Sequence, residues 1–280
     1  MSDEFKTNFL NLVLRHCVNV TVFDRTEGTT ASENNGAGRP LVISGFVISV
    51  DDRWFLITAG HCLRDIETSR DAGRRCQDWQ LDDSTRPNAQ NSLPIPFDYE
   101  GTPKLVILNE ETGIDYAAFY LRPYYRNLLA SNGIRPFPDP WRKDIKGDFT
   151  AYVLLGVPYE TVDARVVEGI IYQKYQPTAI GLTRIDQPTG SLTRGDWFYA
   201  KLPDAGGEYY VDSIVGMSGG PITGFGKDED NHLCYWLLAL QSGWSPSERE
   251  IRACPIAIFA RAISEGMQKV LSSEKQPRDE

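Results

Sequence analysis

The sequence has no long apolar run and no basic block, although 41% of its 280 residues are hydrophobic. Its longest apolar segments, such as Tyr235–Leu240, have the length of buried strands and fall well short of a membrane span. The net charge is −9 and lysine and arginine are scattered, so a nucleic-acid partner is not expected. The chain is long enough for one large β unit or two small domains. We therefore expect a protein that binds neither a membrane nor a nucleic acid.

Cysteine is scarce, and its spacing forms no pattern. The five cysteines are an odd number, and no Cys-x-x-Cys pair occurs. This pattern disfavours both a disulfide framework and a zinc site, so free thiols in a reducing cytosol are the simpler interpretation. Met1–Leu10 carries Asp3 and Glu4 rather than the basic start and apolar centre of a signal peptide. We expect a cytoplasmic protein without a metal or a cofactor.

Turn-forming residues are abundant, with 24 glycines and 17 prolines, and they separate many short apolar segments that predict strands. Helices are expected in residues 2–16, at Tyr124–Ala130 and at Ala262–Leu271. The expected strands are Cys17–Phe23, Leu41–Val50, Arg53–Thr58, a segment near Trp79, Leu105–Leu108, Tyr116–Leu121, Thr150–Gly156, Val166–Tyr172, Trp197–Leu202, Pro221–Gly224, Cys234–Ser242 and Pro255–Ala260.

These elements form two β-rich halves that a Pro-rich segment, residues 134–148, joins. The expected organisation is a helical extension at 1–16, a first half at 17–133, a second half at 134–271 and a flexible tail at 272–280. No internal repeat relates the two halves. The sequence therefore predicts an all-β protein with a helix near each end.

The most informative motif is residues 216–221, Gly-Met-Ser-Gly-Gly-Pro. Serine becomes a nucleophile when a base takes its proton, and the flanking glycines allow a tight turn whose N–H groups can point at one spot. In an acyl-transfer site these would be the N–H groups of Gly216 and Ser218, which would form an oxyanion hole. The alternative is a glycine-rich turn that carries an ordinary serine.

The same residues also fit the Gly-x-Ser-x-Gly elbow of α/β-hydrolases. That fold needs a helix directly after the serine, and then an acid and a histidine in that order. Here Pro221 and Gly224 follow, which disfavours a helix, and the only later histidine is the nearby His232. The α/β-hydrolase interpretation fails on both points.

Histidine is rare, and this narrows the choice of a catalytic base. The three histidines are His16, His61 and His232. His16 ends the expected N-terminal helix, and His232 lies in an acidic turn. His61 follows a buried strand and a turn of small residues, Ala59-Gly60. A histidine in such a place is often structural, but the serine motif needs a base and His61 is the best candidate.

Two further segments complete a resemblance to chymotrypsin-like serine proteases. Residues 57–62, Ile-Thr-Ala-Gly-His-Cys, resemble the histidine motif of that family, and residues 113–121, Gly-Ile-Asp-Tyr-Ala-Ala-Phe-Tyr-Leu, resemble its aspartate strand. The order His61, Asp115, Ser218 is also the family's order. The resemblance runs from about Cys17 to Leu271. It implies two antiparallel six-stranded β-barrels with the site between them, and a triad that cleaves peptide bonds through an acyl-enzyme.

Two departures from the family pattern suggest an enzyme made in active form. Secreted members usually carry an aspartate before the serine, which binds a newly cut N-terminal amine, and here that residue is Met217. Cys62 is kept, but its usual partner near Ser44-Gly45 is missing. Both fit an intracellular relative of bacterial type, which has no activating cleavage.

The resemblance also implies a substrate pocket. Asp212, six residues before Ser218 and followed by Ser213, matches the acidic base of a trypsin-like pocket, which would favour cleavage after Arg and less readily after Lys. Residues 241–244 resemble one pocket wall, with Ser242 and Gly243 contacting the substrate. Pro255–Phe259 resembles the opposite wall, where Ala257 would leave the pocket open and Ile256 would crowd it. The alternative is that Asp212 is an ordinary loop residue.

The expected function is therefore that of a trypsin-like serine endopeptidase acting on a protein or peptide. The sequence leaves open general quality control or one dedicated partner, cleaved in a regulatory or defence system. Two other functions also stay open: a protease-like binding module without catalysis, and an esterase that uses the same triad.

Overall fold

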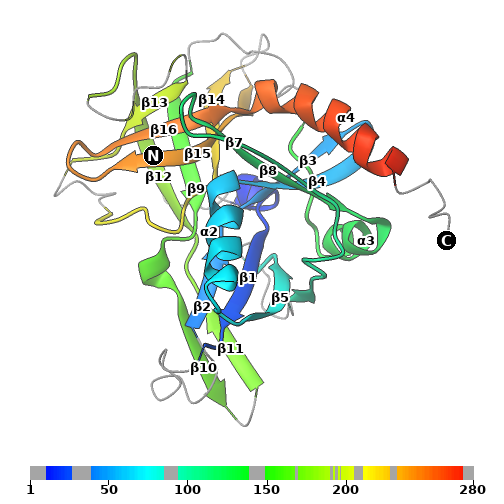
Figure 1. Cartoon of the computed structure of the whole chain (residues 1–280). Helices are drawn as coiled ribbons and strands as arrows, with labels where there is room; N and C mark the ends of the chain where they lie inside the picture. The colour runs from blue at the N-terminus through cyan, green and yellow to red at the C-terminus, as the bar shows by residue number, and fades with distance from the viewer. Residues whose placement is uncertain are drawn as a thin grey trace.

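The computed structural model describes residues 11–26, 39–84, 94–138, 149–167, 170–189, 192, 195, 197–204, 211–227 and 232–273. The strands fall into two groups along the chain, as the sequence predicts (Figure 1). The predicted domain boundaries stay predictions. Outside the described residues lie 1–10, 139–148 of the predicted connector, and 274–280 of the predicted tail.

The second half forms a closed antiparallel barrel of six strands in the order β12-β13-β16-β15-β14-β9. These strands are β9 (Ala151–Gly156), β12 (Thr178–Ile185), β13 (Phe198–Lys201), β14 (Pro221–Lys227), β15 (Leu233–Ser245) and β16 (Glu250–Pro255). Inward-facing Leu154, Ile180, Ile222 and Ile251 are fully buried in its core. The second of the two predicted barrels is thus present.

The first half differs from its prediction, because its described strands pair as two four-stranded sheets and not as one six-stranded barrel. One sheet has the order β2-β1-β5-β6 and the other β3-β4-β8-β7. Their strands are β1 (Asn19–Asp24), β2 (Arg39–Ile43), β3 (Phe46–Val50), β4 (Arg53–Thr58), β5 (Cys76–Asp82), β6 (Ile95–Pro96), β7 (Lys104–Asn109) and β8 (Ile114–Leu121). An isolated bridge between Cys17 and Phe46 joins the sheets at one corner.

Local sequence explains one hairpin of this half well. β3 and β4 pair with Val50 opposite Arg53, which leaves Asp51 and Asp52 as a two-residue turn. Both have positive φ, 49° and 60°, as the tight turns favoured between twisted strands require. Aspartate tolerates this conformation better than most residues, which is why Asp51-Asp52 could be predicted as a turn.

Four corrections concern elements that the sequence pattern misplaced. The strand expected at Val166–Tyr172 is a hairpin of two strands, β10 (Asp163–Val167) and β11 (Ile170–Lys174). The strand expected at Pro255–Ala260 stops at Pro255, and helix α4 (Ile256–Ser273) begins there, earlier than the predicted Ala262. His61 lies in the first turn of a helix, α2 (Gly60–Asp71), where the sequence predicted none. The single strand expected at Leu41–Val50 is interrupted between β2 and β3.

The remaining helices are short. They are α3 (Pro123–Ser131), the 3₁₀ turn η2 (Tyr159–Thr161) and a helical turn at 11–14, which is the described part of the predicted N-terminal helix. None of the helices in the described ranges has the length and apolar composition needed to cross a bilayer.

A shared apolar core joins the two halves. It contains Ile48 and Phe55 from the first half, Phe225 and Leu240 from the barrel, and Phe259 from α4. In Figure 1, α4 (red) runs from the barrel across the first half, and it packs on β15, β3 and β7. Packing from both halves therefore fixes the junction at which α2, β8 and the turn before β14 meet.

Candidate active site

His61 lies at the start of α2, directly after the buried strand β4 and the fully buried Ala59. The residue before it must be glycine, because a Cβ at Gly60 would lie 2.9 Å from the carbonyl oxygen of Tyr116 and 3.2 Å from Asp115 Oδ1. This close approach brings the first turn of α2 against the start of β8. The glycine thus allows the close approach that brings His61 and Asp115 side by side.

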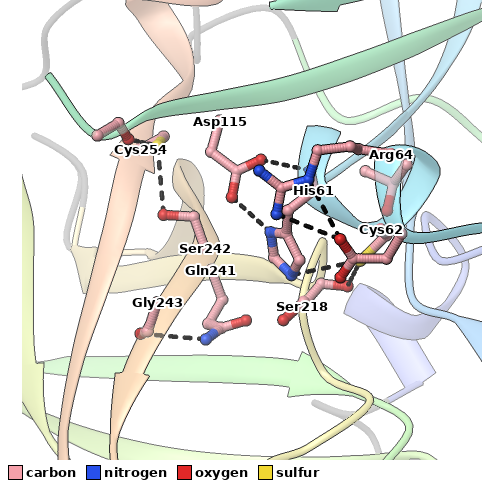
Figure 2. Close-up of polar contacts among 12 residues, drawn as sticks. His61, Cys62, Arg64, Asp115, Ser218, Gln241, Ser242, Gly243 and Cys254 are labelled. Carbon is pink, nitrogen blue, oxygen red and sulfur yellow. Dashed lines mark hydrogen bonds and ion pairs between the residues drawn. The ribbon is translucent and has the colours of Figure 1, made fainter. Parts of the chain in front are cut away.

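Asp115 receives two hydrogen bonds from His61 (Figure 2). The backbone N–H of His61 donates to Oδ1 at 2.9 Å, and Nδ1 of the ring lies 2.6 Å from Oδ2. The Asp115 side chain is only 5% exposed. Hydrogen bonds to both carboxylate oxygens fix the carboxylate and orient the imidazole. The acid of a catalytic triad orients its base in this way.

A neighbouring residue ties this pair to the second half. Tyr116 Oη donates to the carbonyl of Pro255 at 2.6 Å, and its ring stacks on Phe259 with the centroids 4.4 Å apart. Tyr116 is 1% exposed. The position of Asp115 relative to β16 and α4 is therefore fixed across the junction.

The pKa of His61 is raised to about 10. Burial opposes the charged ring, but the hydrogen bonds to Asp115 and Cys62 and the charges of both groups outweigh it. The other two histidines differ. Burial lowers the pKa of His16 to about 4, with its ring stacked on Phe137, and His232 is exposed. Of the three, His61 alone is placed beside both an acid and the serine turn.

Ser218 lies in a tight turn before β14 that contains two glycines with positive φ. Gly216 and Gly219 have φ of +94° and +90°. A Cβ at Gly219 would lie 2.1 Å from Thr58 Oγ1 and 2.4 Å from the Ser44 carbonyl, so only glycine fits. Glycine at these two motif positions thus allows both a positive φ and the close approach of neighbouring atoms.

The backbone donors of this turn divide into two groups. The N–H groups of Met217, Gly219 and Gly220 donate to carbonyls within the turn or to Gln241 of β15. Those of Gly216 and Ser218 have no acceptor among the described residues. These are the two donors that the sequence assigned to an oxyanion hole, and both residues line the same cavity.

Ser44, which the sequence analysis noted only as a missing cysteine position, holds this turn in place. Its Oγ donates to the carbonyl of Gly216 at 2.9 Å and accepts from the N–H of Val157 at 2.9 Å. The side chain is buried and comes from the first half, whereas both partners belong to the second. Ser44 therefore connects the oxyanion turn to the opposite half of the molecule.

The candidate nucleophile and the candidate base are not hydrogen-bonded to each other among the described contacts: Ser218 Oγ makes no hydrogen bond to His61. Instead, Cys62 Sγ lies 3.6 Å from His61 Nε2 and 3.9 Å from the Ser218 carbonyl (Figure 2). Catalytic hydrogen bonds are often long without substrate and tighten when it binds.

A cavity of about 330 Å³ opens beside Ser218, and we call it the Ser218-side cavity. Its walls come from β2, α2, the serine turn and β15, with the residues Val42, Ile43, His61, Cys62, Asp65, Ile214, Val215, Gly216, Ser218, Gln241, Ser242, Gly243 and Trp244. Ser242 and Gly243, which the sequence predicts to contact the substrate, are both in this lining. Asp212 and Ser213 are not in this lining: Asp212 is exposed, and Ser213 Oγ accepts from the N–H of Val215.

The opposite pocket wall needs correction. Pro255–Phe259 does not form it, because α4 begins at Ile256, whose side chain is buried in the core between the halves. The strand opposite Gly243 is β16, with Arg252 as the paired residue. A Cβ at Gly243 would lie 3.3 Å from Nη2 of Arg252, so the guanidinium covers the face that glycine leaves open. Arg252 could not be assigned to the site from the sequence, because the pairing of β15 with β16 shifts register between Gln241 and Gly243.

A second cavity, of about 210 Å³, lies on the other side of His61, and we call it the Asp115-side cavity. It shares His61 and Ser242 with the first cavity, and Arg64, Glu110 and Arg252 supply its further charges. The two cavities thus adjoin at the candidate base.

No protein-family model and no curated protein sequence matches the chain. Similar solved structures include Deg5, with 15% identity over 93% of this chain and 94% of that chain and a TM-score of 0.42. The protease Anisep from Arthrobacter nicotinovorans has 13% identity over 86% and 90% and a TM-score of 0.44. Tobacco etch virus protease in complex with product has 9% identity over 88% and 75% and a TM-score of 0.42. These likenesses are weak and carry no conclusion about function.

Proposed function

We propose that the protein is a serine endopeptidase in which Ser218 attacks the substrate carbonyl, His61 takes its proton and Asp115 orients His61. The observation that carries the proposal is the pair of hydrogen bonds between His61 and the buried Asp115, beside a serine turn in which two N–H groups have no acceptor among the described residues. An ordinary glycine-rich turn has no reason to lie next to such a pair. The free N–H groups of Gly216 and Ser218 would stabilise the oxyanion.

The proton follows a complete path in this scheme. His61 Nε2 removes the Ser218 hydroxyl proton as Oγ bonds to the carbonyl carbon. It then gives that proton to the leaving amine as the peptide bond breaks, which leaves an acyl-enzyme. Water repeats the sequence and frees Ser218. Asp115 keeps its charge throughout and stabilises the imidazolium.

The Ser218→Ala variant tests this assignment by peptide hydrolysis. Turnover of unlabelled protein substrates and peptide amides should fall by several orders of magnitude, while the melting temperature stays within a few degrees. A variant that cleaves at a comparable rate would show that Ser218 is not the nucleophile. If the wild-type chain hydrolyses simple esters and leaves peptide amides intact, the esterase alternative is correct.

A non-catalytic binding module is the second candidate, because no described hydrogen bond joins Ser218 to His61. Such a module would bind peptides in the same cavities without cutting them. A wild-type protein that binds peptides, and that neither hydrolyses them nor reacts with a fluorophosphonate, would favour this function.

The preference for Arg, and less for Lys, before the scissile bond remains a prediction from Asp212. The exposed side chain of Asp212 lies outside the cavity lining, so it would have to turn inward when a basic side chain binds. Asp212→Ser should then lose the preference for Arg over Leu by about tenfold or more while stability is kept. Equal turnover of Arg, Leu and Phe substrates by the wild type would contradict it. The cytoplasmic location and the dedicated partner likewise stay predictions.

A further inference from the structure

Charge pairing in the Asp115-side cavity is incomplete. Asp115 is paired with His61, and Glu110 is paired with Arg64 at 2.5 Å, while Arg64 also contacts Asp65 at 3.2 Å. The guanidinium of Arg252 has no hydrogen bond or ion pair with any described residue. Its Nε is buried and unsatisfied. The cavity therefore contains one cation that nothing in the described chain neutralises.

The strand geometry directs this cation into the cavity. Its neighbours on β16, Ile251 and Ala253, are fully buried in the barrel core, so Arg252 points to the outer face. There it lies across Gly243, which has no side chain to displace it. Arg252 and Gly243 are paired residues of β15 and β16, which are rigid barrel strands. The position of the guanidinium is therefore set by the fold.

We propose that Arg252 binds an aspartate or glutamate side chain of the substrate, at a position near the scissile bond. The proposal rests on the proposed endopeptidase function and adds a second specificity site to it. A partly buried guanidinium without a counter-ion is unfavourable, and a carboxylate can satisfy it through two parallel hydrogen bonds. The Asp115-side cavity shares His61 and Ser242 with the Ser218-side cavity, so a peptide crossing both places this side chain a few residues from the cut.

The acidic side chain and the residue cleaved at Ser218 occupy different cavities. Arg252 therefore selects a second residue of the substrate and leaves the Asp212 prediction unaffected. The other carboxylates of the Asp115-side cavity, Asp115 and Glu110, already have cationic partners, so they do not compete for Arg252.

Cleavage-site profiling with a peptide library tests the proposal. Wild-type protein should prefer Asp or Glu over Asn or Gln at one position near the cut, by about tenfold or more in kcat/KM. Arg252→Gln should reduce that ratio to near one, and Arg252→Glu should reverse it toward Lys or Arg. The matched control is Arg53→Gln, which removes the same charge from an exposed residue at the opposite end of β4 from His61 and should keep the wild-type ratio.

A binding experiment separates this proposal from the proposed function. Ser218→Ala protein, with and without Arg252→Gln, is applied to a peptide array in which each position carries Glu or Gln. Acid-selective binding that Arg252→Gln removes, together with wild-type protein that never cuts, would refute the endopeptidase and keep the Arg252 site. Cleavage without any acidic preference, or a preference that Arg252→Gln leaves unchanged, would overturn the Arg252 site.

Discussion

Ser44 connects the serine turn to the first half by hydrogen bonds. In the family that the sequence resembles, a cysteine at this point pairs with the one after the catalytic histidine, and here the cysteines, Cys62 included, are all free. The Ser44 hydroxyl instead joins Gly216 and Val157 by two hydrogen bonds. Because the Gly216 carbonyl is held, the peptide units on either side of it have little freedom. Ser44 is therefore a positioning residue for the proposed oxyanion hole.

We predict that Ser44→Ala lowers kcat by about ten- to hundredfold and leaves KM within about twofold, because the oxyanion donors matter most in the transition state. The free energy of unfolding should fall by about 1–3 kcal/mol, since the Val157 N–H loses its acceptor. Steady-state kinetics and denaturant unfolding measure the two effects. Ser131→Ala, at an exposed hydroxyl in α3, is the matched control and should change neither. Full kcat in folded Ser44→Ala protein would contradict the role.

Cys62 affects the proposed base, His61, through its sulfur. Together with Asp115 it raises the pKa of His61 to about 10 against the effect of burial. A general base acts only when neutral, so activity should rise with pH above neutrality and reach its plateau once His61 has lost its proton.

We predict that Cys62→Ala shifts the acidic limb of the kcat/KM profile to lower pH. Removal of the sulfur takes away one of the interactions that favour the charged ring, whereas the hydrogen bond to Asp115 remains. The variant should thus gain relative activity near neutral pH. An acidic limb that stays in place, or that moves to higher pH, would show that Cys62 does not act on His61.

The serine turn is the element with the strictest steric requirement. We predict that Gly219→Ala lowers the free energy of unfolding by about 3 kcal/mol or more, because its Cβ would meet both Thr58 and the Ser44 carbonyl. The control is Gly73→Ala at the end of α2, where φ is also positive, +91°, but a Cβ meets nothing within 4 Å. That variant should lose only about 1 kcal/mol. Equal losses in the two variants, measured by denaturant unfolding, would show that φ strain alone is responsible.

Elements with strong local signals could be predicted from the sequence. The hairpin at Asp51-Asp52 and most barrel strands carry alternating apolar residues or a turn with residues suited to it, and these agree with the structure. Helix α2 was missed because it buries only Gly60, Leu63 and Ile66 and is otherwise polar. Its helical conformation depends on packing against β8 and not on a clear periodic pattern.

Elements that depend on neighbours could not be predicted well. Ile256 and Phe259 are apolar in a way that suits a strand or a helix, and the shared core between the halves decides for α4. Because α4 begins at Ile256, the strand opposite Gly243 is β16, and this places Arg252 at the site. Likewise, the proposed triad residues were visible as motifs, whereas Ser44 contacts Gly216 and Val157 far along the chain, and Arg252 lies at the site through its strand pairing with Gly243. No local pattern shows either arrangement.

At the scale of the whole molecule, the site depends on two halves that share one core. His61, Asp115 and Ser44 come from the first half, and Ser218, Gly216 and Arg252 come from the second. Met217, which replaces the family's activation aspartate, is fully buried in the barrel core, and a Cβ at Gly156 would lie 3.0 Å from its own Cβ. An apolar side chain in that place anchors the serine turn without an ammonium partner. We therefore predict that the site needs no activating cut.

Reaction of the full chain, uncut, with a fluorophosphonate tests the central claim most directly, with intact mass and peptide mapping as the measurement. The account predicts one covalent adduct, located on Ser218, formed without prior proteolysis. It also predicts no adduct on Ser218→Ala and a rate for His61→Ala that is lower by several orders of magnitude. A folded wild-type chain that stays unlabelled, or that is labelled only after an N-terminal cut, would contradict the account.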